Sequence, residues 1–361
     1  MTIPVYQTII NTIQEWIQKG KFQSNDKLPS ETQLMEEFST SRITVIRALK
    51  EMELKGIIYR LKGKGSFVAE EKPRYPSEGR VISLVLPHKV DFFSGGQQYA
   101  HQIYSSCQER GYLCSLHYSD QSTRKERQIL EEIEGHNVAG AIIYPISNRN
   151  AAILSRMSIK GFPMVLLDRK LEELSLPVVT SDNFQGALKA VTYLAERGHK
   201  RIGFIGAKDS DVVSERYRGY CYALTDSGIP MDMDLLITQF TGNTEDERSQ
   251  LDENEALHIL KKLRKKNISA IFCVNDLIAY RLLMAAQKLN ISVPEELSLV
   301  GFDNLKYMDD TSWKLTTVAQ DFESIARGCV SILVDMIEKG VETHVEDMIV
   351  PTRFLKGNTL G

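Results

Sequence analysis

Ten short apolar runs alternate with longer amphipathic segments between residues 81 and 321 of this 361-residue chain. Near-continuous apolar strands separated by helices are typical of a parallel sheet covered by helices on both faces. The runs form two series, so we expect an α/β fold with two lobes over residues 81–361. The first series is 81–87, 112–118, 140–145, 163–168 and 177–182, and the second is 201–206, 235–240, 270–276, 297–303 and 316–321.

A different pattern occupies residues 1–70 and predicts a helix-turn-helix with a small β wing. Apolar residues recur at helical spacing over 6–19, and Ser30-Glu31-Thr32-Gln33 forms a capping box that starts a second helix. Thr40-Ser41 offers the N-cap of a third helix, which we expect to end at Gly56. Two β-prone runs then flank the glycine turn Lys62-Gly63-Lys64-Gly65. The polar segment 71–80 contains two prolines and is expected to be a linker.

The charge distribution restricts any nucleic-acid contact to one region. The net charge is −3, but residues 40–65 carry seven basic and two acidic side chains. A polyanion would therefore meet its complementary charge in the N-terminal segment.

The third helix of this segment has an unusual outer face. Val45, Ala48, Leu49 and Met52 share one side, and the opposite side mixes isoleucines with cations. Such a mixture suits the major groove, where cations meet phosphates or guanine edges and apolar groups meet thymine methyls. A charged helix in a three-helix bundle is the alternative, and the adjacent turn and basic wing favour DNA. The outer residues are Ile43, Ile46, Arg47 and Lys50, with Arg42 on the flank.

Residues 3–69 resemble the winged helix-turn-helix of the GntR family. The matching pieces include Lys27-Leu28-Pro29-Ser30-Glu31, Ser41-Arg42, Thr44-Val45, Arg47-Ala48-Leu49 and Gly63-Lys64-Gly65-Ser66-Phe67-Val68. The resemblance implies DNA contacts from Arg42 and Thr44, an orienting role for Glu31, and minor-groove contacts from Lys64 and Gly65. Ile46 stands where family members often have a second basic residue. The expected DNA-binding set is Glu31, Arg42, Ile43, Thr44, Ile46, Arg47, Lys64 and Gly65.

Polar side chains close the apolar runs of the large domain, where open α/β sheets bind ligands. Carboxylates at several strand ends suit a polyhydroxylated ligand, and Phe92 or Phe93 could stack on a sugar face. Arg216 and Arg218 add donors. Each strand-end aspartate has the alternative role of helix N-cap, and Asp182 is the most ambiguous. The aspartates are Asp168, Asp182, Asp276, Asp303 and Asp321, accompanied by Asn275 and Gln320.

Residues 80–356 resemble the sugar-binding domain of LacI/GalR-type repressors. The matching motifs include 163–169, 181–183, 198–205, 216–220, 273–276, 300–304 and 315–318. The resemblance implies two lobes that close around a sugar, a homodimer, and ligand contacts at matching positions. Val90-Asp91 replaces the usual Asn-Pro before the aromatic pair, so Phe92 stays a candidate beside Phe93. The expected ligand-binding set is Phe92, Phe93, Asp168, Arg216, Asn275, Asp303 and Gln320.

A GntR-type head on a LacI-type body is similar to arabinose-responsive repressors of Gram-positive bacteria. We therefore expect a transcriptional regulator, most often a repressor, that binds pseudo-palindromic operator DNA and answers to a small sugar such as a pentose, with arabinose the leading candidate. A solute-binding protein of a sugar transporter is the alternative. An enzyme is disfavoured because no P-loop, GxSxG or metal-ligand cluster occurs. We expect no cofactor or metal, no membrane span, and a cytoplasmic location with reduced cysteines.

Overall fold

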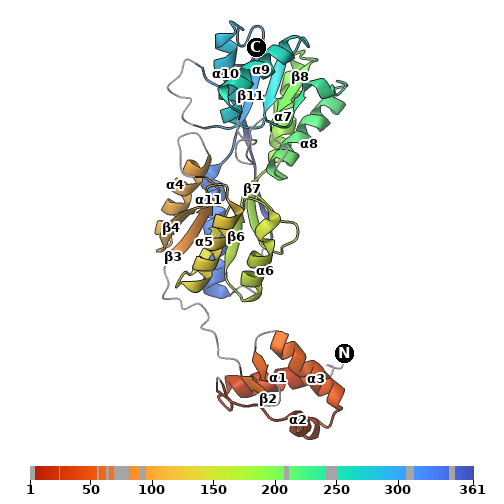
Figure 1. Ribbon diagram of the computed structural model, residues 1–361, viewed down its shortest axis with the longest axis vertical. Helices are drawn as coiled ribbons and strands as arrows, with labels where there is room; N and C mark the ends of the chain where they lie inside the picture. Colours follow the sequence, from red (N-terminus) through yellow and green to blue (C-terminus); the bar gives the residue numbers. More distant parts are fainter. Residues whose placement is uncertain are drawn as a thin grey trace. The chain divides into compact units, whose positions relative to one another are not determined.

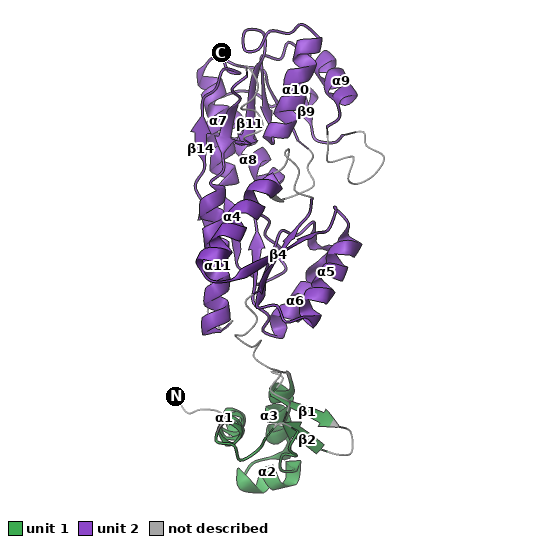
Figure 2. Ribbon diagram, turned by 90° about the vertical axis from the view of Figure 1, so that its left-hand side faces the viewer, with its two compact units in different colours: residues 1–76 green, residues 77–361 purple. Residues whose placement is uncertain are grey.

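The computed structural model describes residues 5–23, 25–54, 57–61, 65–68, 81–88, 95–206, 211–240, 251–305, 313–340 and 346–361. The chain divides into two compact units, residues 1–76 and 77–361 (Figure 2). The expected linker 71–80 lies outside the described residues.

The first unit is a three-helix bundle with a two-stranded antiparallel sheet (Figure 1). Helices α1 and α3 bury the apolar stripes that the sequence predicts, with Ile9, Ile10 and Ile13 packed against Val45 and Leu49. Its elements are α1 (Val5–Gln18), α2 (Glu31–Glu37), α3 (Arg42–Leu54), β1 (Ile58–Leu61) and β2 (Gly65–Val68).

Local hydrogen bonds fix the turn between α2 and α3. Ser30 accepts from the Gln33 N–H while Gln33 accepts from the Ser30 N–H, so the predicted capping box is confirmed. Ser39 adopts a positive φ of 45° in the turn, and Ser41 Oγ accepts from the Thr44 N–H at 3.4 Å. These contacts set the angle at which α3 leaves α2, and the predicted winged helix-turn-helix is present.

The first lobe of the second unit contains a six-stranded sheet in the order β13-β7-β6-β5-β3-β4, with parallel pairing throughout. Helices α4 and α11 pack against each other and contribute to one core with the sheet. The strands are β3 (Val81–Leu86), β4 (Leu113–Tyr118), β5 (Gly140–Ile143), β6 (Met164–Leu167), β7 (Val178–Ser181) and β13 (Met348–Val350). The helices are α4 (Gly95–Glu109), α5 (Thr123–Gly135), η1 (Asn148–Asn150), α6 (Ala151–Ile159) and α11 (Phe322–Lys339).

The second lobe repeats this plan with the order β14-β12-β11-β10-β8-β9. Its pairs are parallel except for β14, which runs antiparallel to β12. The strands are β8 (Ile202–Ile205), β9 (Leu236–Ile237), β10 (Ala270–Cys273), β11 (Ser298–Asp303), β12 (Thr316–Ala319) and β14 (Arg353–Leu355). The helices are α7 (Asn183–Glu196), α8 (Asp211–Asp226), η2 (Met233–Leu235), α9 (Glu253–Arg264) and α10 (Asp276–Lys288).

The chain passes between the lobes at residues 182, 320–321 and 351–352. Consequently α11 follows the last long strand of the second lobe but packs on the first (Figure 1). The expected strand at 235–240 is reduced to Leu236–Ile237: Leu235 is the last residue of the helical turn η2, and residues 238–240 form no strand. Strands β13 and β14 were not predicted, since each has only three residues and lies at a sheet edge.

Gly219 allows α7 and α8 to approach closely, which predicts that Gly219→Ala destabilises the second unit. A methyl group at this position would lie 2.4 Å from the Phe184 carbonyl oxygen and 2.9 Å from the Leu188 nitrogen. Because backbone atoms cannot rotate away, we expect a loss of about 1–3 kcal/mol in the free energy of unfolding. Urea unfolding followed by circular dichroism measures this loss. Gly135→Ala is the control, since nothing lies within 4 Å of its added methyl; equal midpoints for the two variants would contradict the prediction.

Candidate functional site

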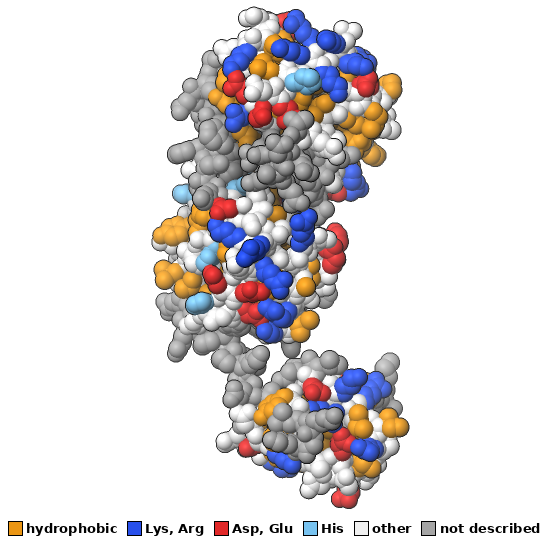
Figure 3. Space-filling view, viewed as in Figure 1, with side chains coloured by type: hydrophobic (Ala, Val, Ile, Leu, Met, Phe, Trp, Pro, Cys, Tyr) orange, Lys and Arg blue, Asp and Glu red, His pale blue; other side chains and the backbone are white. Residues whose placement is uncertain are grey.

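The outer face of α3 combines exposed apolar and cationic side chains. Ile43 is 81% exposed, and the Arg42 side chain is 71% exposed. Figure 3 shows apolar and basic side chains sharing the visible surface of this unit. Ile43 is not part of the described core of this unit.

Glu31, the first residue of α2, connects two cations. Its carboxylate contacts Arg42 Nε at 3.1 Å and Arg60 Nη2 at 2.7 Å. Arg42 begins α3 and Arg60 belongs to β1, so the pairings link the start of both helices to the wing. The structure thus provides the Glu31–α3 contact that the resemblance implies.

The remaining predicted DNA-binding residues differ in exposure. Thr44 is half-buried and its hydroxyl lies 2.9 Å from Ser41 Oγ, while Ile46 is half-buried and Arg47 is exposed. Gly65 opens β2 with a positive φ of 117°, a conformation that favours glycine. Lys64 lies outside the described residues.

In the second unit, the guanidinium of Arg216 is the centre of a buried polar cluster. Its Nε donates to Asn183 Oδ1 at 2.8 Å and its Nη1 to the Val274 carbonyl at 2.5 Å. Its Nη2 pairs with Asp303 Oδ1 at 3.1 Å, and its Cζ lies 3.6 Å from the centre of the Phe302 ring. The cation is 4% exposed, so these partners replace the water that it loses.

Gln320 extends this cluster between the lobes. Its Nε2 donates to Asp303 Oδ1 at 2.7 Å, and its Oε1 accepts from Ser181 Oγ at 2.7 Å and from the Tyr99 hydroxyl at 3.3 Å. Burial raises the pKa of Asp303 to about 6, although Arg216 and Gln320 both stabilise its charged form; the charge of Asp168 raises it as well. The Tyr99 ring meets the Tyr144 ring edge-on, with 6.2 Å between their centres, which extends the cluster into the first lobe.

Asp168 follows β6 in the first lobe with a positive φ of 64°. Its carboxylate accepts from the Tyr144 hydroxyl at 2.7 Å, and its carbonyl accepts from Thr180 Oγ1 at 2.8 Å. Of the expected ligand set, the structure thus brings Asp168, Arg216, Asp303 and Gln320 together. Phe92 and Phe93 lie outside the described residues.

The other strand-end polar residues mainly stabilise backbone. Asp182 caps α7 through the Gln185 N–H and Asp321 caps α11 through the Ser324 N–H. Asn275 Oδ1 caps α10 through the Ile278 N–H at 2.9 Å, so its oxygen is already engaged. Asp276 is 1% exposed and accepts from the Thr317 hydroxyl at 2.6 Å and the Leu305 N–H at 2.8 Å. The cap alternative therefore holds for Asp182 and Asp321.

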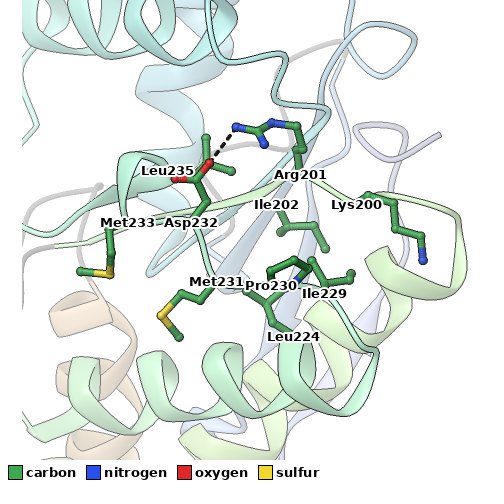
Figure 4. Close-up of a pocket in the computed structure, with 10 residues that line it drawn as sticks. All are labelled: Lys200, Arg201, Ile202, Leu224, Ile229, Pro230, Met231, Asp232, Met233 and Leu235. Carbon is green, nitrogen blue, oxygen red and sulfur yellow. Dashed lines mark hydrogen bonds and ion pairs between the residues drawn. The ribbon is translucent and has the colours of Figure 1, made fainter.

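A separate open hollow of about 300 Å³ lies beside the amino end of β8 (Figure 4). Its lining includes Lys200 and Arg201, which precede β8, together with Met231 and Met233. Strands β8, β10 and β11 are parallel. The hollow therefore lies at the amino ends of these strands, whereas Asp303 lies at the carboxyl ends. It does not belong to the polar cluster around Arg216.

Two family models match the chain. Bacterial regulatory proteins of the gntR family match residues 5–68, and a periplasmic binding protein-like domain matches residues 191–360. Together they cover the helix-turn-helix unit and much of the two-lobed unit.

Individual relatives extend this similarity to nearly the whole chain. The arabinose metabolism transcriptional repressor of Geobacillus stearothermophilus is 27% identical over 99% of this chain and 98% of its own. The HTH-type transcriptional repressor CytR of Escherichia coli K12 is 30% identical, covering 73% of this chain and 74% of its own. A LacI family transcriptional regulator from Enterococcus faecium, solved with bound ribose, has a TM-score of 0.66 and 25% identity over 78% of this chain and 98% of its own.

The chain belongs to the helix-turn-helix transcriptional repressors. Its head is of the GntR type and its body is of the LacI type. A repressor of this family is a DNA-binding regulator and not an enzyme, and the gntR head disfavours the transporter alternative. Within the described residues, no helix has the length and apolar character needed to cross a membrane.

Several residues of the polar cluster were not predicted from the sequence. Tyr99, Tyr144, Ser181 and Asn183 supply its hydrogen bonds, and Arg169 has a buried Nε with no hydrogen-bond partner among the described residues. Tyr144, Ser181 and Asn183 lie at the ends of apolar runs or directly after them, so the strand-end criterion could have found them had it included every polar residue there. Tyr99 lies inside a helix and carried no such signal.

Because the carboxyl of Asp276 is buried, we expect the free energy of unfolding to depend on pH. Burial raises its pKa from the ordinary value of 3.8 to about 8, and the charge of Asp303 contributes in the same direction. Between these values the native state holds a proton that the unfolded chain lacks, so stability falls as pH rises toward about 8. The slope from this group is at most about 1.4 kcal/mol per pH unit. Urea unfolding of wild type and Asp276→Asn between pH 6 and 8 should show a flatter dependence for the variant; parallel curves would contradict this.

Proposed function

We propose that this repressor controls carbohydrate-utilisation genes and that a small sugar bound between its two lobes changes its affinity for DNA. The observation that carries the proposal is the convergence of Asp168, Asp303 and Gln320 at strand ends of the two lobes with Arg216 of α8. Carboxylates accept from sugar hydroxyls, and guanidinium and amide groups donate to sugar oxygens. A sugar that favours one lobe arrangement would shift the population of the two states and change how the heads are presented.

Two of the relatives favour a monosaccharide as the effector. The Geobacillus relative is named for arabinose metabolism, and the Enterococcus structure contains ribose. Both sugars are pentoses, and arabinose is the leading candidate because that relative also spans the head. Asn275, Phe92 and Phe93 complete the proposed ligand-binding set.

On the DNA side, we propose that α3 enters the major groove and that the wing contacts the minor groove beside it. Arg42, Ile43, Thr44, Ile46 and Arg47 form the proposed recognition face, Lys64 and Gly65 the wing contact, and Glu31 orients Arg42. A homodimer would bind a pseudo-palindromic operator, since two-fold protein symmetry requires matching half-sites.

Arg42→Ala should weaken binding to an operator selected from a random library by about 1–3 kcal/mol if Arg42 reads a base. Fluorescence anisotropy at fixed salt measures the affinity, and competition among operator variants measures the preference. Lys19→Ala is the matched control. It also removes one cation from the first unit, but Lys19 pairs with Glu15 on α1 and is not part of the proposed recognition face. An unchanged operator preference in Arg42→Ala would remove Arg42 from the recognition face.

A thermal-shift screen of pentoses, hexoses and their phosphates tests the effector site. A sugar at a hundredfold excess over its Kd should stabilise the protein by about 2.7 kcal/mol. Asp303→Asn keeps the shape of the side chain but removes its charge, so it should abolish this stabilisation while DNA affinity is retained. Asp226→Asn, an exposed change at the end of α8, serves as the control. A wild-type sugar response in Asp303→Asn would exclude Asp303 from the site.

A further inference from the structure

The exposed cation Arg47 is held by an aromatic ring from another helix. The Cζ atom of Arg47 lies 3.9 Å from the centre of the Tyr6 ring, and its Nε lies 3.4 Å from Glu51 Oε1. Tyr6 belongs to α1, whereas Arg47 and Glu51 belong to α3. Two contacts from different directions therefore restrict a side chain that remains 61% exposed.

The ring itself is fixed by the head core. Tyr6 is half-buried and packs against the cluster that contains Ile9, Ile10 and Val45. Because α1 packs directly on α3, the packing of the two helices holds the ring beside Arg47.

Stacking leaves the hydrogen-bonding edge of the guanidinium available. A cation–π contact uses the face of the planar group, and Glu51 engages Nε, so the Nη1 and Nη2 donors stay free of both contacts. A planar pair of N–H donors matches phosphate oxygens in a bidentate geometry. An arginine fixed in this way loses less side-chain entropy when it binds.

We propose that Tyr6 is a positioning residue that orients Arg47 toward a backbone phosphate of bound DNA. The inference rests on the proposed recognition face of α3. The Tyr6 ring belongs to α1 and lies 3.9 Å from the Arg47 Cζ, so it holds the guanidinium on the side of the outer face of α3 that is nearer α1. The flanks of a helix in the major groove face the phosphates, and base edges face its centre.

A double-mutant cycle on the full chain tests this role, using a random-sequence duplex pool because a phosphate contact does not depend on sequence. Tyr6→Leu should weaken binding about two- to fivefold, and Tyr6→Phe, which retains the ring, should bind like wild type. Arg47→Ala should reduce the slope of log K against log salt by about 0.9. Tyr6→Leu combined with Arg47→Ala should bind no more weakly than Arg47→Ala alone.

Several results would overturn the proposal. Additive losses in the double variant, or equal losses in Tyr6→Phe and Tyr6→Leu, would show that the ring does not act through Arg47. A changed preference among operator variants in Arg47→Ala would assign Arg47 to a base. Thermal melting of each variant separates a folding defect from a binding defect. Tyr6→Phe, which keeps the ring, is expected to bind DNA like wild type and to melt at the same temperature. If Arg42→Ala binds normally, the recognition face itself fails; if only Tyr6→Leu binds normally, this inference alone fails.

Discussion

The ion pair of the buried Arg216 guanidinium with Asp303 is the interaction on which the polar cluster between the lobes depends. Removing one partner of a buried cation costs several kcal/mol, so its surroundings are constrained together. Arg216 joins Asn183 at the start of α7, the Val274 carbonyl after β10 and Asp303 at the end of β11. Asp303 in turn fixes Gln320, whose amide reaches the first lobe. A single charge thereby sets the positions of groups from four separated segments of the chain.

The crossings of the chain explain why these groups lie between the lobes. Ser181 and Asn183 flank the first crossing, and Gln320 lies in the second. A change in lobe angle must alter the backbone at these crossings, which carry or adjoin the polar contacts. In the proposed site, contact with a sugar and the arrangement of the lobes would involve the same residues, as a population-shift mechanism requires.

The sequence predicted local structure well and long-range placement poorly. The apolar runs identified most strands of both sheets, and the capping box at Ser30 located α2. Nothing in the sequence of α11, which follows the strands of the second lobe, indicated that this helix packs on the first lobe. Tyr99 illustrates the same limit in the site, because its hydroxyl meets Gln320 across 221 residues of sequence. Helical periodicity carries no information about such a pairing.

The five strand-end aspartates show how backbone context divides one residue type among different roles. Asp182 and Asp321 stand immediately before helices, where a carboxylate gains most by accepting a free N–H, and Asp276 is the buried first residue of α10. Asp168 and Asp303 instead adopt positive φ values of 64° and 109°, and no helix follows them directly. Aspartate tolerates this turn geometry, which frees the carboxylate from capping. Sequence distance to the next helix is therefore the criterion that separates candidate ligand-binding carboxylates from caps in a sheet of this kind.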